Sequence, residues 1–134
     1  MNTTTNRAAD NIRILAASMV EKAKSGHPGG AMGGADYINV LYSEFLNFDP
    51  DDAEWVNRDR FFLDPGHMSP MLYATLSLIG KYSMEDLKNF RQWGSITPGH
   101  PEVDVKRGVE SSGSGTCHGR RSSYRRTFSG SPFR

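Results

Sequence analysis

Two stretches in the N-terminal half repeat apolar residues at the spacing of an amphipathic helix. In residues 6–25, alanine, isoleucine, methionine and valine side chains share one face, and charged side chains lie off it. A second apolar face runs from about Gly33 to Leu46, after a start rich in glycine and alanine. Such a start can pack tightly against another backbone or an anion. The chain is therefore predicted to begin with two helices.

Two further helices are predicted later in the chain. Ser69 stands before a proline, which makes it a good N-cap for a helix that Gly80 ends. A shorter helix is expected from Ser83 to about residue 93, with Asp86 placed to complete a capping box.

Between these pairs of helices, residues 60–63 (Arg-Phe-Phe-Leu) form a short apolar run bounded by charged and turn residues. This pattern is typical of a short buried strand. A strand ending at Leu63, followed by a loop and a helix, fits one edge of an open parallel sheet. The predicted fold class is therefore α/β, mostly helical, with ligands expected at the carboxyl end of the strand.

Three histidines stand in turns framed by glycine or proline: Gly-His-Pro at His27, Gly-His-Met at His67 and Gly-His-Pro at His100. Gly26 is expected to stop the first helix, because glycine adopts the left-handed conformation easily. Histidine titrates near neutral pH, so three histidines gathered at one site would suit proton transfer or binding of hydroxyl and phosphate groups. Two alternatives stay open at this point. The histidines could bind zinc, or they could be ordinary turn residues satisfied by the backbone.

Composition limits the class of protein. With 134 residues the chain is at most one modest domain. It has no apolar run long enough to span a bilayer and no signal-peptide pattern at its start, so no membrane association is expected. The single cysteine, Cys117, cannot form an internal disulfide, which favours the cytoplasm.

Charge divides the chain near Glu110. Residues 1–110 carry 11 Lys and Arg against 15 Asp and Glu, a net charge of −4. Residues 111–134 carry five arginines and no acidic residue, a net charge of +5, and are rich in serine and glycine. The expected organisation is one partial domain over 1–110 and a disordered tail over 111–134. A basic tail can bind nucleic acid, which is an alternative but not the favoured function.

The order and spacing of several motifs resemble the N-terminal part of transketolases. Five segments carry the resemblance: Lys22–Gly30, Arg58–Phe61, Gly66–His67, Leu87–Gln92 and Thr97–Glu102. The resemblance covers about residues 6–110. It implies an incomplete portion of an open parallel-sheet domain that binds thiamine diphosphate with Mg (or Ca). It also implies transfer of a two-carbon ketol unit between ketose and aldose phosphates in the pentose phosphate pathway.

The resemblance also suggests roles for the three histidines. By position, His27 corresponds to a histidine that contacts substrate and handles protons. His67 corresponds to one near the cofactor diphosphate, and His100 to one that contacts the hydroxyls of the donor sugar. No residue of this chain is assigned to the metal. Members of the family are homodimers, but too much of that interface is missing for a dimer to be expected here.

Beyond Glu110 the sequence departs from the family pattern, which continues with a Gly-Pro-Leu turn that touches thiamine. Reading the message of the tail one nucleotide later can encode that turn and an apolar helix, so a frameshift near Glu110 is expected. The chain is then a truncated piece, expected to be inactive alone and prone to aggregate through uncovered apolar faces. A subunit of a split transketolase is a further alternative.

Overall fold

A computed structural model describes residues 3–110, which form a helical assembly. The elements are α1 (Thr3–Ala23), α2 (Pro28–Gly33), α3 (Ala35–Val40), the π-helix η1 (Leu41–Phe45), the 3-10 helix η2 (Gly66–Met68), α4 (Ser69–Leu78), α5 (Met84–Lys88) and the 3-10 helix η3 (Val105–Arg107). The expectations for residues 111–134, including the tail and the frameshift, lie outside this range.

The predicted strand at residues 60–63 is wrong. This segment has no regular secondary structure, and the described range contains only an isolated antiparallel bridge between Asp104 and Val109. The apolar run packs into the core nonetheless, because Leu63 is buried. A strand needs a neighbouring strand to pair with, and residues 3–110 provide none. The mostly helical character is as predicted, whereas the open sheet is not seen in this part of the chain.

Helix α1 buries the face that its periodicity predicts, through Ala9, Ile12, Ala16 and Met19. It ends at Ala23, two residues earlier than predicted. Lys24 already has a left-handed backbone, with φ of 49°, so the chain leaves the helix before it reaches Gly26. Gly26 has φ of 129° and continues the turn.

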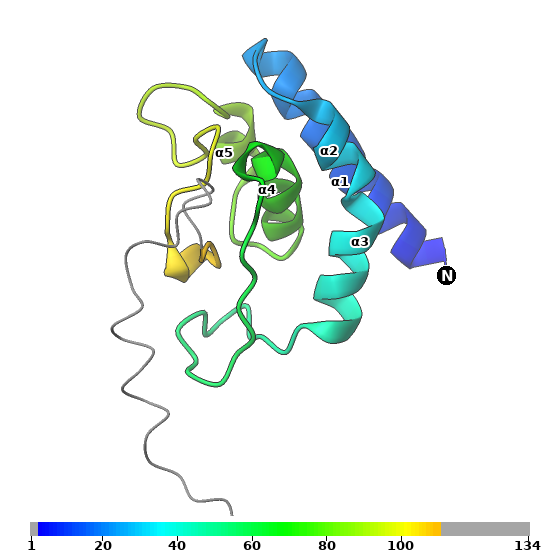
Figure 1. Cartoon of the computed structure of the whole chain (residues 1–134), viewed down its shortest axis with the longest axis vertical. Coiled ribbons are helices and arrows are strands. Elements are labelled where there is room, and N and C mark those ends of the chain that lie inside the picture. Colours follow the sequence, from blue (N-terminus) through cyan, green and yellow to red (C-terminus); the bar gives the residue numbers. More distant parts are fainter. Residues whose placement is uncertain (1–2, 111–134) are drawn as a thin grey trace, which may run out of the picture.

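The second helical region starts earlier than predicted. Pro28 occupies the first turn of α2, where its fixed φ suits a helix start and its missing N–H costs nothing. Helices α2, α3 and η1 then follow one another almost without a break from Pro28 to Phe45, and α2 and α3 run back along α1 (Figure 1). The glycine-rich segment is therefore inside this helical region, not before it.

Helix α4 lies at the centre of the molecule and contacts α1, α2, α3 and α5 (Figure 1). Residues Ser69 to Leu76 of this helix are all buried, as expected for a helix that is covered on every side. Ser69 is not the N-cap, which is Met68 instead. Ser69 already has a helical backbone, with φ of −46° and ψ of −35°, and its hydroxyl donates to the distant Gly99 carbonyl.

Helix α5 begins with the predicted capping box. The Ser83 hydroxyl accepts from the Asp86 backbone N–H, and the Asp86 carboxylate accepts from the Ser83 backbone N–H. The helix ends at Lys88, about five residues earlier than expected. The chain turns soon afterwards, because Arg91 has a left-handed backbone with φ of 60°.

In the described range, no helix combines the length and apolar character needed to cross a membrane.

Candidate functional site

Two of the three predicted site histidines lie against each other. The centroids of the His27 and His67 rings are 5.0 Å apart, with an angle of 69° between the ring planes. His27 is exposed at the N-terminus of α2, and His67 is half-buried in η2. Of the three histidine turns predicted to gather at one site, the structure brings these two into contact.

Close packing of α2 on two methionines brings the pair together. A Cβ at Gly30 would lie 3.0 Å from Met68 Cγ, and a Cβ at Gly34 would lie 2.6 Å from Met71 Sδ. Because glycine has no Cβ, α2 approaches η2 at Gly30, and the C-cap residue Gly34 approaches the start of α4. Gly30 therefore serves close packing with a neighbouring side chain. The position of His67, next to Met68, follows from that contact.

The turn that carries His100 is held by side chains from α4. Ser69 Oγ donates to the Gly99 carbonyl at 2.6 Å, and the Tyr73 hydroxyl donates to the Pro98 carbonyl at 3.0 Å. Burial raises the pKa of Tyr73 above its ordinary value, so this hydroxyl stays a donor at neutral pH. Ser69 follows His67 by two residues, so the Ser69–Gly99 bond joins the second histidine turn to the third.

His100 itself is exposed, and the ring contacts of the described residues do not include it. None of the three imidazoles forms a hydrogen bond with another residue in the range 3–110. The alternative of histidines satisfied by the backbone therefore finds no support among the described residues.

The sequence did not indicate a role for Arg91, but in the structure its side chain contacts both the His27 turn and the His100 turn. Its Nη1 donates to Ser25 Oγ at 2.7 Å, across 66 positions of the chain. Its backbone N–H donates to the Thr97 carbonyl at 3.0 Å. A Cβ at Gly99 would lie 2.6 Å from Arg91 Nε, so the guanidinium lies against the third histidine turn. No local pattern could have shown a contact of this range.

The zinc alternative is not supported by the described part of the chain. Residues 3–110 contain no group of three or more histidine, cysteine, aspartate or glutamate side chains that could hold a metal ion.

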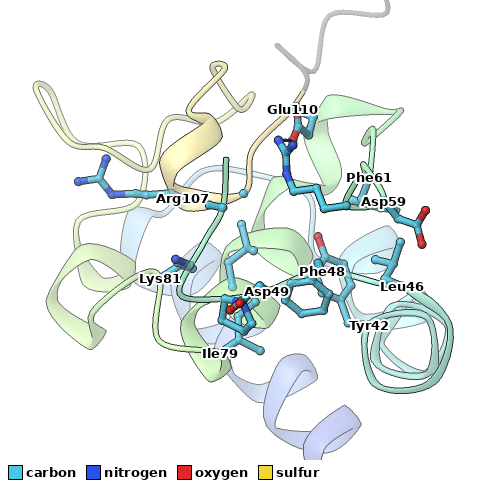
Figure 2. Close-up of a pocket in the computed structure, with 15 residues that line it drawn as sticks. Tyr42, Leu46, Phe48, Asp49, Asp59, Phe61, Ile79, Lys81, Arg107 and Glu110 are labelled. Atoms are coloured by element: carbon cyan, nitrogen blue, oxygen red, sulfur yellow. Dashed lines mark hydrogen bonds and ion pairs between the residues drawn. The ribbon is translucent and has the colours of Figure 1, made fainter. Parts of the chain in front are cut away.

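A small cavity lies apart from the histidines, beside the aromatic cluster of Tyr42, Phe48 and Phe61 (Figure 2). Its volume is about 40 Å³, enough for roughly one water molecule. No histidine lines it. Burial, and secondarily the charge of Glu110, raises the pKa of Tyr42, which keeps this phenol neutral. The cavity therefore lies among packed aromatic side chains and is separate from the three histidines.

A buried ion pair closes one side of this cavity. Arg58 Nη2 pairs with Glu110 Oε1, and both side chains are less than a tenth exposed. Arg60 Nη1 lies 3.5 Å from Glu110 Oε2. Arg58 also donates to the Trp55 carbonyl at 3.2 Å. The pair joins the end of the described chain to the long loop after η1.

Comparison with known proteins identifies the relatives of this chain. The family model described as transketolase, thiamine diphosphate binding domain, matches residues 4–119. Transketolase of Halalkalibacterium halodurans is 53% identical over 104 residues, which cover 77% of this chain and 16% of that protein. Chloroplastic transketolase-1 of Arabidopsis thaliana is 51% identical over 107 residues, covering 78% of this chain and 14% of that protein.

Solved structures show the same relationship. Transketolase from Leishmania mexicana superimposes with a TM-score of 0.73 at 48% identity, over 78% of this chain and 16% of that one. A Pichia stipitis transketolase in complex with sedoheptulose-7-phosphate superimposes with a TM-score of 0.72 at 40% identity, over 81% and 16%. The chain thus spans about a sixth of the length of these relatives. Because the family model matches most of the chain, this chain belongs to the transketolase family through its thiamine diphosphate binding domain.

Proposed function

We propose that this chain forms one wall of a thiamine diphosphate and sugar-phosphate site, in which His67 faces the cofactor diphosphate and His27 and His100 face the substrate. The observation that carries the proposal is the contact between the His27 and His67 rings, with centroids 5.0 Å apart. Two turns that are far apart in the sequence thus place two imidazole rings next to each other. A site that must serve a cofactor and a substrate together needs this proximity.

The side chains present suit a diphosphate. A ring N–H donates well to a phosphate oxygen, and the hydrogen bond strengthens when the imidazole is protonated. Thiamine diphosphate supplies the carbanion chemistry when it is bound. The part of this chain is to bind and orient the reactants: His67 donates to the diphosphate, His27 moves a proton at a substrate hydroxyl, and His100 contacts sugar hydroxyls. The residues present do not fit the family's divalent metal, because residues 3–110 hold no group of ligands for one.

The proposed reaction is transfer of a two-carbon ketol unit from a ketose phosphate to an aldose phosphate, in the pentose phosphate pathway. The similarity to a transketolase solved with sedoheptulose-7-phosphate supports sugar phosphates as the substrate class. We further infer that the 134 residues by themselves do not catalyse this transfer. They correspond to about 16% of the relatives' length, so most of the chain that forms the site in those relatives has no counterpart here. The cytoplasm is the proposed location.

Ligand titration followed by NMR of the histidine rings tests the proposal. Adding thiamine diphosphate to the full chain should move the His67 ring signals most, while thiamine without the diphosphate should not move them. His67→Asn should abolish the response. Lys81→Ala, which changes a cation beside the small cavity, is the control and should keep it. A response that is equal at His67 and at unrelated surface residues, or unchanged in His67→Asn, would refute the assignment.

A further inference from the structure

We infer that Arg91 is a positioning residue that holds the His27 turn and the His100 turn in register, so that both histidines face the same ligand. The inference rests on the proposed function, since it names the residue that keeps that site assembled. Arg91 touches neither cofactor nor substrate in this proposal. It acts through Ser25 on one side and through residues 97–99 on the other.

The contacts of Arg91 reach both turns at once. On one side Nη1 donates to the hydroxyl of Ser25, two residues before His27, at 2.7 Å. On the other side the backbone N–H donates to Thr97 and the guanidinium lies against Gly99, next to His100. Arg91 is thus hydrogen-bonded to the first turn and is both hydrogen-bonded to and packed against the third. A shift of one turn is therefore transmitted directly to the other through this residue, in addition to the path through His67 and Ser69.

The geometry of Arg91 is costly for a residue without such a role. Its backbone has φ of 60°, a left-handed conformation that a side chain with a Cβ rarely adopts. Its Nε is buried and finds no hydrogen-bond partner among the described residues. Strain and an unsatisfied donor persist only where surrounding structure maintains them, and they concentrate at functional sites. Both features place the guanidinium where it can reach Ser25 while lying on Gly99.

Glycine at position 99 is the counterpart of this arrangement. Any Cβ there would lie within 2.9 Å of three guanidinium atoms of Arg91. The third turn is also held from α4 through Ser69 and from α5 through Thr97, whose Oγ1 donates to the Asp86 carbonyl at 2.8 Å. Apart from the Ser25 hydrogen bond, the contacts of the first turn with this part of the molecule are packing contacts, since a Cβ at Gly26 would lie 3.5 Å from Phe90 Cε1 and the His27 ring lies against His67. Losing Arg91 should therefore release the first turn more than the third.

NMR of the full chain with labelled histidine, without any ligand, tests the inference. Ser25→Ala removes one exposed hydroxyl and should move the His27 ring signals and weaken the cross-peak between the His27 and His67 rings. Arg91→Ala should do the same and also move His100. Arg91→Lys keeps the charge but cannot both reach Ser25 and cover Gly99, so it should not restore the His27 signals. Arg13→Ala is the matched control, because Arg13 pairs with Asp10 and Asp36 elsewhere on the surface.

The inference is overturned if Ser25→Ala leaves all histidine ring signals as they are in Arg13→Ala, or if Arg91→Lys restores them fully. If Arg91→Ala loses the dispersed methyl signals of the core, Ser25→Ala alone decides. The measurement needs no cofactor, so its failure is separate from failure of the thiamine diphosphate assignment. That assignment fails when the wild-type chain shows no response of His67 to the ligand.

Discussion

At the scale of single residues, the contact between the two histidine turns depends on glycines whose missing Cβ leaves room for neighbouring side chains. Gly30 and Gly34 face Met68 and Met71 across a contact in which no Cβ fits without displacement. Gly29 and Gly33 lie in α2, like Gly30, but have open space around them, and Gly34 caps the end of that helix. The four glycines cannot be distinguished in the sequence. Only the fold shows that Gly30 and Gly34 are needed for close packing and that Gly29 and Gly33 are not.

The Gly34 contact predicts a specific loss of stability. A Cβ in Gly34→Ala would lie 2.6 Å from Met71 Sδ and 3.3 Å from the Gly30 carbonyl oxygen. Overpacking of this kind costs about 1–3 kcal/mol of unfolding free energy. Gly33→Ala is the control, and it should be neutral or stabilising by up to about 1 kcal/mol, because alanine favours a helix. Urea unfolding compares the two, and equal stabilities would contradict the packing argument.

The raised pKa of Tyr82 predicts that the free energy of unfolding falls at alkaline pH. Burial, and then the charge of Asp104, raises the pKa of Tyr82 to about 12, whereas an unfolded tyrosine titrates near about 10. The folded state therefore favours the neutral phenol. Its contribution to stability is complete below about pH 10 and is lost as the pH rises toward about 12.

Tyr82→Phe should accordingly lose less stability than the wild type between about pH 9 and pH 11.5 in urea unfolding. Some loss should persist, because burial also raises the pKa of Tyr42 and Tyr73. Tyr37→Phe alters an exposed tyrosine and is the control, with a pH dependence like that of the wild type. A Tyr82→Phe profile identical to that control would refute the prediction.

At the scale of elements, long-range bonds join segments that have little regular structure. The loop between η1 and η2 has no helix or strand, yet Arg58 within it pairs with Glu110 at the end of the described chain. Arg60 adds a second cation near the same carboxylate. The loop is therefore anchored by charge as well as by its buried Leu63.

Removing the carboxylate of Glu110 should cost much of the stability. Glu110→Gln leaves the buried Arg58 guanidinium without its counter-charge, and breaking such a pair typically costs about 3–5 kcal/mol. Glu44→Gln, at an exposed position of η1, should change the unfolding free energy by less than about 0.5 kcal/mol. Thermal and urea unfolding measure both variants. If the Glu110→Gln and Glu44→Gln variants are equally stable, groups other than Glu110 compensate the charge of Arg58.

The elements also show what the sequence could and could not predict. The face of α1 and the capping box of α5 follow from periodicity and local capping chemistry, and the structure confirms both. The gathering of the histidines was predicted from three similar turns, and the structure brings His27 and His67 into contact. The strand at 60–63 and the capping role of Ser69 were wrong. Both residue patterns are local, whereas the outcome depends on distant partners: a neighbouring strand in one case and the Gly99 carbonyl in the other.

At the scale of the whole molecule, apolar side chains remain on the surface of a small helical assembly. Tyr37 is 64% exposed and Phe45 is 71% exposed, and both line a groove on α3 and η1 together with Val40 and Leu41. Trp93, in a loop after α5, is fully exposed. Clustered apolar surface of this kind promotes association in water.

Concentration-dependent self-association is therefore expected in sedimentation velocity. Replacing Tyr37 and Phe45 together by serine should reduce it without lowering the unfolding free energy, because neither side chain is part of the core. Val56→Ser removes an apolar side chain that is 75% exposed but does not line this groove, and it should reduce association less. Equal association of the double variant and the wild type would show that another surface is responsible.

The tight contact between α2 and the two methionines has a consequence for oxidation chemistry. Conversion of Met68 to its sulfoxide adds an oxygen to a sulfur that would lie 3.2 Å from a Cβ at Gly30. The oxide is bulkier and polar, so it crowds the same space that the missing Cβ leaves free. Peroxide would then separate the two helical segments and part the His27 and His67 rings. Reduction by a methionine sulfoxide reductase would let them meet again, which makes this site sensitive to oxidants although residues 3–110 contain no cysteine.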